Sequence, residues 1–267
     1  MTPSSSPAAR KPIELAKLSG RIVFDNFEDV WSINADGTDL TRLTEASGPE
    51  FDPSWSPDGT RIAYRSELGD ETEIWIMNAD GTHKRRLALG LAPAWSPDGS
   101  LIAFAGKYES VGIIKLIKPD GTGLRSLPGT DGGEYPTWSP NGKRIAFNSN
   151  LTGQHVMYVA EADGSNVTSL AEVGEGWQVD WSPDGRSILF TSHRDHDNNY
   201  TDVYVTRPDG SDIRRLTLDV GYTPAWSPEG EYVVYSAPAL CVMKPDGSGK
   251  SCLPTNVGET SLADWVN

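Results

Sequence analysis

The chain has 267 residues and a formal net charge of −14 at pH 7. This excess of acidic residues argues against a nucleic-acid partner, because the phosphate backbone of nucleic acids selects basic surfaces. No uninterrupted apolar stretch approaches the roughly 18 residues that a membrane-spanning helix requires, so we expect no insertion into a membrane.

Residues 1–19 are expected to form a flexible leader or linker. The stretch MTPSSSPAAR is rich in Ser and Pro, a composition typical of extended, unpacked chain. It also lacks the apolar core of a secretory signal peptide. The folded domain is therefore assigned to residues 20–267.

A Trp-Ser-Pro turn motif recurs along this domain, as in PSWSPDGTRIAY (53–64) and PAWSPDGSLIAF (93–104). Its tryptophans are Trp55, Trp95, Trp138, Trp181 and Trp226, separated by 40, 43, 43 and 45 residues, and a further 39 residues lead to Trp265. In this motif Pro fixes φ and offers no backbone donor, which suits a turn but not a central strand. The motif is therefore interpreted mainly as scaffold, with the Trp packed between repeats.

A second motif alternates with the first and contains Asp-Gly. It occurs as INADGT (33–38), MNADGT (77–82), IKPDGT (117–122), AEADGS (160–165), TRPDGS (206–211) and MKPDGS (243–248). Asp-Gly between apolar runs predicts a hairpin, because Gly accepts the positive φ of such turns. Each repeat thus contains four short strands.

A repeat of about 40–45 residues with four strands is typical of a propeller blade. The chain begins with three strand segments, GRIVF (20–24), DVWSINADG (29–37) and TRLT (41–44), and ends with a lone one, SLADW (261–265). Together these segments complete one blade. We therefore predict an all-β, six-bladed β-propeller of four-stranded antiparallel blades, closed by pairing the C-terminal strand with the N-terminal blade, which leaves no free edge.

These motifs resemble the repeats of the TolB family of β-propellers (WD40-like or PD40 repeats), in which WSPDG and DGT motifs alternate in the same order. The resemblance covers residues 20–265. It implies a TolB-like propeller without the separate N-terminal domain of TolB, or one domain of a longer protein.

Two cysteines, Cys241 and Cys252, flank the predicted hairpin VMKPDGSGKS. If the hairpin turns at Asp246-Gly247, the cysteines lie on neighbouring strands, within reach of a disulfide. A disulfide would indicate an oxidising compartment. Two free thiols in a blade remain an equal alternative at this point.

The loops expected at one end of the propeller are acidic. This end, the top face, carries the loops between the second and third strands of each blade and the crossovers between blades. Twenty acidic and three basic residues fall in these segments, among them Glu50, Asp52 and Glu175. Although such loops can be only solvated surface, they predict a negative face that attracts a basic partner.

Aromatic residues are expected at the top mouth of the central channel. The residues four positions before the repeated Trp are Phe51, Leu91, Glu134, Trp177, Tyr222 and Ser261. Three aromatic rings, a Leu and a Glu around one opening resemble an interface hot spot. The alternative is that these side chains cap the cores between blades.

Two candidate metal sites follow from acidic residues. Asp180 and Asp264 are the only charged residues directly before a repeated Trp and could hold Ca²⁺ or another divalent cation in the channel, as the TolB resemblance hints. In the loop SHRDHDNNYTD (192–202), Asp195, His196 and Asp197 offer oxygen and nitrogen ligands. That loop also resembles an ordinary turn of the repeat.

The sequence contains no Gly-x-Ser-x-Gly, Walker, or His-Glu-x-x-His motif. It therefore predicts a non-catalytic, monomeric scaffold without a required cofactor, located in the periplasm or outside the cell. The expected partner is a protein or peptide with a basic patch. The alternative is a metal-dependent enzyme of lyase or hydrolase type, or a small-molecule or carbohydrate binder that uses the central channel.

Overall fold

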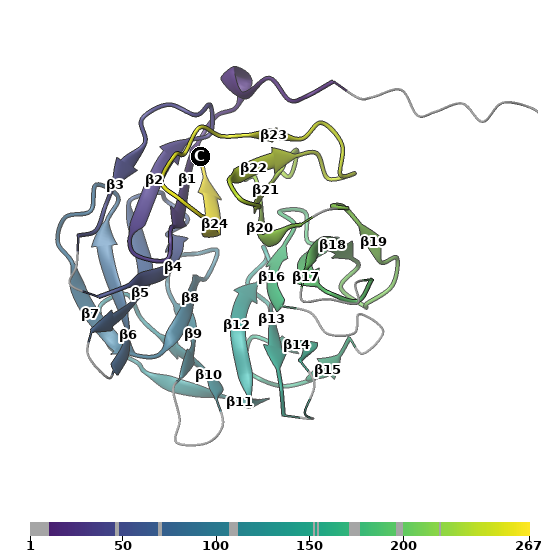
Figure 1. Ribbon diagram of the computed structural model, residues 1–267. Helices are drawn as coiled ribbons and strands as arrows, with labels where there is room; N and C mark the ends of the chain where they lie inside the picture. Colours follow the sequence, from purple (N-terminus) through teal and green to yellow (C-terminus); the bar gives the residue numbers. More distant parts are fainter. Residues whose placement is uncertain are drawn as a thin grey trace, which may run out of the picture.

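A computed structural model of the protein describes residues 11–45, 48–68, 71–106, 112–151, 153, 155–170, 177–195, 200–218 and 220–267. These residues form six four-stranded antiparallel sheets arranged as a ring around a central axis (Figure 1). The predicted six-bladed, all-β propeller is therefore confirmed. Within the described ranges, no helix is long and apolar enough to cross a membrane.

Each blade runs from an inner strand at the axis to an outer strand at the rim. The first blade consists of β24 (Ser261–Val266), β1 (Arg21–Asp25), β2 (Val30–Asn34) and β3 (Thr41–Arg42). The second consists of β4 (Glu50–Trp55), β5 (Arg61–Leu68), β6 (Glu71–Asn78) and β7 (Arg85–Leu89). The third consists of β8 (Leu91–Trp95), β9 (Ile102–Gly106), β10 (Ile113–Ile117) and β11 (Arg125–Asp131). The fourth blade consists of β12 (Gly133–Trp138), β13 (Arg144–Ser149), β14 (Val156–Glu161) and β15 (Thr168–Ser169). The fifth consists of β16 (Trp177–Trp181), β17 (Ile188–Ser192), β18 (Asp202–Thr206) and β19 (Arg214–Arg215). The sixth consists of β20 (Tyr222–Trp226), β21 (Val233–Ser236), β22 (Leu240–Met243) and β23 (Ser251–Cys252).

The repeated Trp-Ser-Pro turn satisfies its own backbone groups. In the second blade the Ser56 hydroxyl donates to Asp58 Oδ1 at 2.6 Å and accepts from the Arg61 N–H at 2.9 Å. Asp58 Oδ1 also accepts from the Thr60 N–H at 3.1 Å, and Gly59 has the positive φ (66°) that the turn requires. The motif recurs because each blade needs this turn.

The repeated tryptophans pack between neighbouring blades. Trp95 of the third blade is 6% exposed and joins a core with Ile74 and Ile76 of the second blade. The guanidinium of Arg61, also on the second blade, lies 4.7 Å from the Trp95 ring centre. Each interface between blades thus has its own small apolar core.

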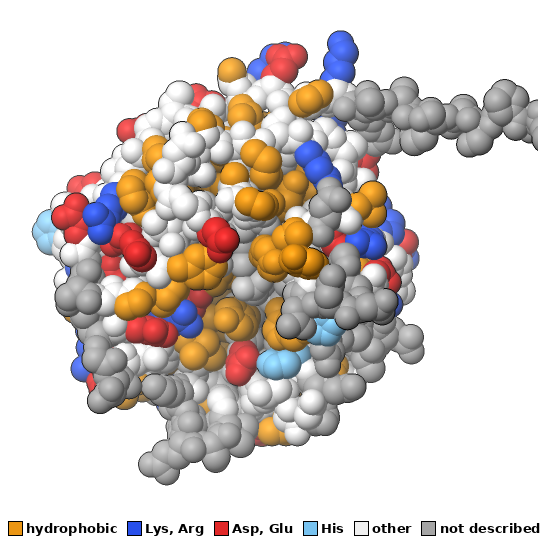
Figure 2. Space-filling view, in the orientation of Figure 1, with side chains coloured by type: hydrophobic (Ala, Val, Ile, Leu, Met, Phe, Trp, Pro, Cys, Tyr) orange, Lys and Arg blue, Asp and Glu red, His pale blue; other side chains and the backbone are white. Residues whose placement is uncertain are grey.

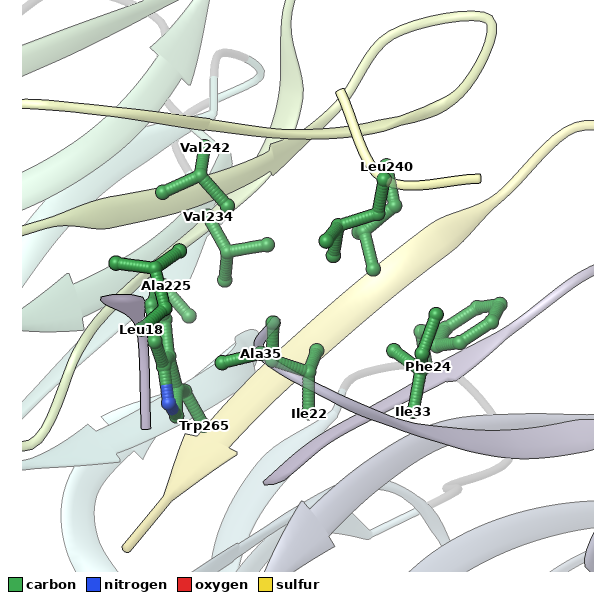
Figure 3. Close-up of a cluster of buried hydrophobic side chains, with 11 residues drawn as sticks. Leu18, Ile22, Phe24, Ile33, Ala35, Ala225, Val234, Leu240, Val242 and Trp265 are labelled. Atoms are coloured by element: carbon green, nitrogen blue, oxygen red, sulfur yellow. The ribbon is translucent and has the colours of Figure 1, made fainter. Parts of the chain in front are cut away.

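The ring closes by pairing the two ends of the folded chain. β24 pairs antiparallel with β1, placing Trp265 opposite Ile22 and Asp264 opposite Val23. The buried cluster at this closure combines Ile22 and Trp265 of the first blade with Val234 of the sixth (Figure 3). The predicted closure is confirmed.

Residues 11–19 run along the outside of the closing blades and include a short 3₁₀ helix, η1 (Leu15–Lys17). The Ile13 N–H donates to the Gly249 carbonyl at 3.0 Å, and its carbonyl accepts from the Ser251 hydroxyl at 2.8 Å. Leu18 is 9% exposed and belongs to the closure core. This part of the predicted leader therefore contacts the propeller, whereas residues 1–10 lie outside the described residues.

The two cysteines lie opposite each other on β22 and β23 and form a disulfide. Replacing both by Ser is expected to lower the free energy of unfolding by about 3 kcal/mol, because the bond closes a loop with a sequence separation of 11. Chemical denaturation with and without a reductant would measure this loss. The double variant should not respond to reductant, and an unchanged stability in both experiments would contradict the prediction.

Candidate functional site

A cavity of about 310 Å³ occupies the axis of the ring and is lined by the inner strands of the blades. One position of each inner strand, three residues before the repeated Trp, lines it: Asp52, Ala92, Tyr135, Gln178, Thr223 and Leu262. All six have positive φ, between 29° and 53°. At this position the register between the two inner strands of every blade shifts, which is the signature of a β-bulge.

The residues predicted for the channel mouth come directly before these bulges. They do not line the axial cavity but start the inner strands at its top end, and most are partly buried: Phe51, Leu91, Glu134, Trp177 and Tyr222. The structure thus brings them around one opening, while the channel wall itself is built from the next residue along. Sequence reasoning did not single out Tyr135 or Gln178, because a bulge with positive φ at a non-glycine residue leaves no compositional signal.

The Trp177 ring lies close to two imidazoles. Its ring centre lies 5.4 Å from that of His155 on the fourth blade and 5.0 Å from that of His193 on the fifth. On the second blade the Arg65 guanidinium lies 4.3 Å from the Phe51 ring centre. The mouth aromatics are therefore held by polar neighbours and not by the apolar cores alone.

Asp180 and Asp264 both line the axial cavity, and each accepts a backbone N–H from the following blade. The Trp226 N–H donates to Asp180 at 2.8 Å, and the Trp55 N–H donates to Asp264 at 2.7 Å. Burial raises the pKa of Asp180 to about 7 and that of Asp264 to about 6. These carboxylates connect inner strands that share no sheet.

A second pair of carboxylates lies beside the channel at the first two blades. Asp25 is fully buried; it accepts from the Asp52 N–H at 3.3 Å, and Asp52 in turn accepts from the Ala92 N–H at 3.2 Å. Arg65 Nε lies 3.4 Å from Asp52 Oδ2. Burial, and then the neighbouring Asp52, raise the pKa of Asp25 to about 7, and burial also raises the pKa of Asp52.

The remaining predicted site residues are placed as follows. Glu50 starts β4 and is 3% exposed, and burial raises the pKa of its carboxyl. Asp195 is exposed and accepts from the Tyr204 hydroxyl at 2.8 Å. Glu175, His196 and Asp197 lie outside the described residues. Within the part of the chain that the structure describes, no group of three or more His, Cys, Asp or Glu could hold a metal ion.

Exposed hydrophobic side chains concentrate on the top face. Of the large exposed hydrophobic residues among those described, five lie at the top end of the blades, four in loops and one at the end of β7: Phe27, Leu151, Tyr200, Leu218 and Leu89. Two, Leu124 and Val167, lie at the opposite end, the bottom face, where the Trp-Ser-Pro and Asp-Gly turns are. Figure 2 views the ring from one end and shows hydrophobic side chains gathered around the central hollow, with acidic side chains among them.

The sequence profile of the TolB β-propeller domain, PD40, matches residues 2–176 and 91–253. The chain belongs to the TolB β-propeller domain family. No curated protein sequence matches it.

Solved structures share the fold of this TolB-type propeller. TolB from Acinetobacter baumannii superimposes with a TM-score of 0.80 at 22% identity, covering 96% of this chain and 68% of that one. A putative TolB from Agrobacterium tumefaciens superimposes with a TM-score of 0.74 at 21% identity, covering 94% of this chain and 99% of that one. A chain of a nidogen/laminin complex superimposes with a TM-score of 0.75 at 12% identity, covering 92% of this chain and 97% of that one.

Proposed function

We propose that this TolB-type propeller is a non-catalytic scaffold that binds a protein or peptide through its top face. The observation that carries the proposal is the gathering of exposed hydrophobic side chains there, at loops presented by a rigid ring. Trp177 and Tyr222 at the channel mouth would act as anchors. The acidic top loops would attract a partner with a basic patch.

Two further points support this proposal. Membership of the TolB propeller family fits a binding module, and one structure of similar fold belongs to a protein–protein complex, that of nidogen with laminin. The disulfide between Cys241 and Cys252 fits an oxidising compartment, so we propose a periplasmic or extracellular location. The proposed scaffold acts as a monomer and needs no cofactor.

Affinity capture from an extract of the source organism tests this proposal. The wild type is compared with a Glu134, Trp177 and Tyr222 triple-alanine variant, and with a control in which the bottom-face residues Leu124 and Val167 are replaced by Ala. A protein retained by the wild type and the control, but lost by the triple variant, would support the top face. Equal retention by all three would contradict it.

The double substitution Trp177→Ala and Tyr222→Ala is expected to cost about 2–4 kcal/mol of binding free energy to that partner, because truncated aromatic anchors have effects of this size. Calorimetry would measure the loss. The melting temperature should change little, since both side chains are partly exposed; a large drop would show that they cap the cores between blades.

Salt and chelators extend the same binding measurement. Screening by salt should slow association with a basic partner, and a salt-independent association rate would contradict steering by the acidic face.

A chelator of divalent cations should leave the affinity for the partner unchanged. Loss of binding on chelation would instead favour the alternative of a metal-dependent enzyme or a small-molecule or carbohydrate binder.

A further inference from the structure

Three arginines surround one depression on the bottom face of this acidic protein. The depression, of about 470 Å³, is lined by Arg144, Arg186, Arg207, Pro208 and Asp209. Arg144 begins β13 of the fourth blade, and the other four lie in the two turns of the fifth blade. The depression therefore lies where these two blades meet, at the opposite end of the ring from the top face.

Two of the three guanidinium groups are held by specific neighbours, a Trp ring and a carboxylate. That of Arg144 lies 4.9 Å from the Trp181 ring centre, and Arg207 Nε lies 3.8 Å from Asp212 Oδ2, at the edge of ion-pair distance. Within the described part of the chain, the side chains of Arg144 and Arg186 form no ion pair. Three arginines line one depression, and two of them have no ion-pair partner among the described residues, an arrangement that favours the entry of an anion.

The nearby acidic side chains are engaged in their own turns. Asp209 accepts from both the N–H and the hydroxyl of Ser211, at 2.9 and 2.6 Å. Asp184 accepts from the Ser182 hydroxyl at 2.6 Å and from the Arg186 N–H at 3.0 Å. These hydrogen bonds, and to a lesser extent the charges of Arg186 and Arg207, lower the pKa of both carboxyls, so both stay ionised while they accept hydrogen bonds within their own turns.

The propeller repeat does not itself require this arrangement. The same three positions recur at every interface between blades. They are the residue at, or directly before, the start of the second strand, the residue before its counterpart in the next blade, and the residue opening that blade's Asp-Gly turn. From the first interface to the sixth they are occupied by Arg21, Thr60, Asn78; Arg61, Ser100, Lys118; Leu101, Lys143, Glu161; Arg144, Arg186, Arg207; Ser187, Glu231, Lys244; and Tyr232, Gly20, Asn34. Only the fourth interface carries three arginines.

We propose that this depression, the arginine groove, binds an oxyanion of the phosphate class. Guanidinium groups match the oxygens of phosphate or sulfate with paired, charge-assisted hydrogen bonds. Arg186 and Arg207, which are exposed, would close over an anion held against the stacked Arg144. The anion is either free or part of a lipid headgroup, and the two sources share this recognition chemistry.

Titration with inorganic phosphate at constant ionic strength, followed by calorimetry or by the arginine Nε–H signals, tests the proposal. The variants are Arg186→Gln and Arg207→Gln, which leave the Arg144 stack intact. The matched control is Arg125→Gln, because Arg125 lines a bottom-face groove between the third and fourth blades whose lining contains no second arginine. We expect each test variant to weaken phosphate binding about tenfold or more, and the control to bind as the wild type does.

Two results would overturn the proposal: no phosphate binding by the wild type, or equal weakening in the control and the test variants. Vesicles of phosphatidylglycerol then separate the sources, with phosphatidylcholine vesicles as reference. Binding to the anionic vesicles that phosphate displaces, and that Arg186→Gln loses, identifies a headgroup. Phosphate binding without vesicle binding identifies a free anion.

Discussion

A chain that ends at residue 260 is expected to lose its folded state at room temperature, because it lacks β24. Losing the buried Trp265 alone should cost about 3–5 kcal/mol. Losing the Asp264 carboxylate leaves the Trp55 N–H without its partner, at a further cost of about 1.5–3 kcal/mol. The strand pairing with β1 is lost as well. The total approaches or exceeds the roughly 5–15 kcal/mol that stabilises a typical domain.

Circular dichroism in the near ultraviolet, where packed tryptophans give a signal, would measure this loss. A synthetic peptide of residues 259–267 should restore the signal by adding the missing strand, whereas a peptide of the same composition in scrambled order should not. A truncated chain that unfolds cooperatively, with nearly the stability of the full-length protein, would show that closure by β24 is dispensable.

The fold could be predicted because its repeated turns have recognisable sequence motifs. Asp-Gly and Trp-Ser-Pro-Asp-Gly motifs constrain φ locally, so their order and spacing determine strands, blades and closure without knowledge of distant contacts. The lone SLADW segment at 261–265 specified the closing strand for the same reason. The sequence alone did not decide between a disulfide and two free thiols, because the pairing of Cys241 and Cys252 depends on the position of the hairpin turn.

The site was less predictable because it depends on a backbone irregularity and on contacts between blades. The bulge residues share no chemistry, since they range from Asp52 and Tyr135 to Leu262, yet all adopt positive φ and line the cavity. The predicted mouth position, four residues before each repeated Trp, is therefore the residue before each bulge, and the cavity is lined by the residue that follows it. Likewise, the bond from the Trp55 N–H to Asp264 spans 209 residues, which no local motif reveals.

The buried carboxylates make the stability of the ring depend on pH. Asp25 is fully buried, and its pKa rises from 3.8 to about 7 in the folded protein. Between these values the folded state keeps a proton that the unfolded chain releases, so this group stabilises the fold at low pH. Its contribution is lost as the pH rises through 7. A shift of this size corresponds to about 4 kcal/mol.

Asp25→Asn should remove this dependence, because no charge is then buried. The amide oxygen can still accept from the Asp52 N–H, whereas the Phe27 N–H loses the second carboxylate oxygen as its acceptor. Denaturant unfolding between pH 5 and pH 8 is expected to show the wild type losing about 3 kcal/mol from this group, and the variant gaining stability over the wild type at pH 8. Asp180→Asn is the matched comparison: burial raises the pKa of Asp180 to about 7 as well, so a change of the same sign and similar size is expected. A variant less stable than the wild type at pH 8 would show that ionised Asp25 is stabilised by Arg65 more strongly than burial penalises it.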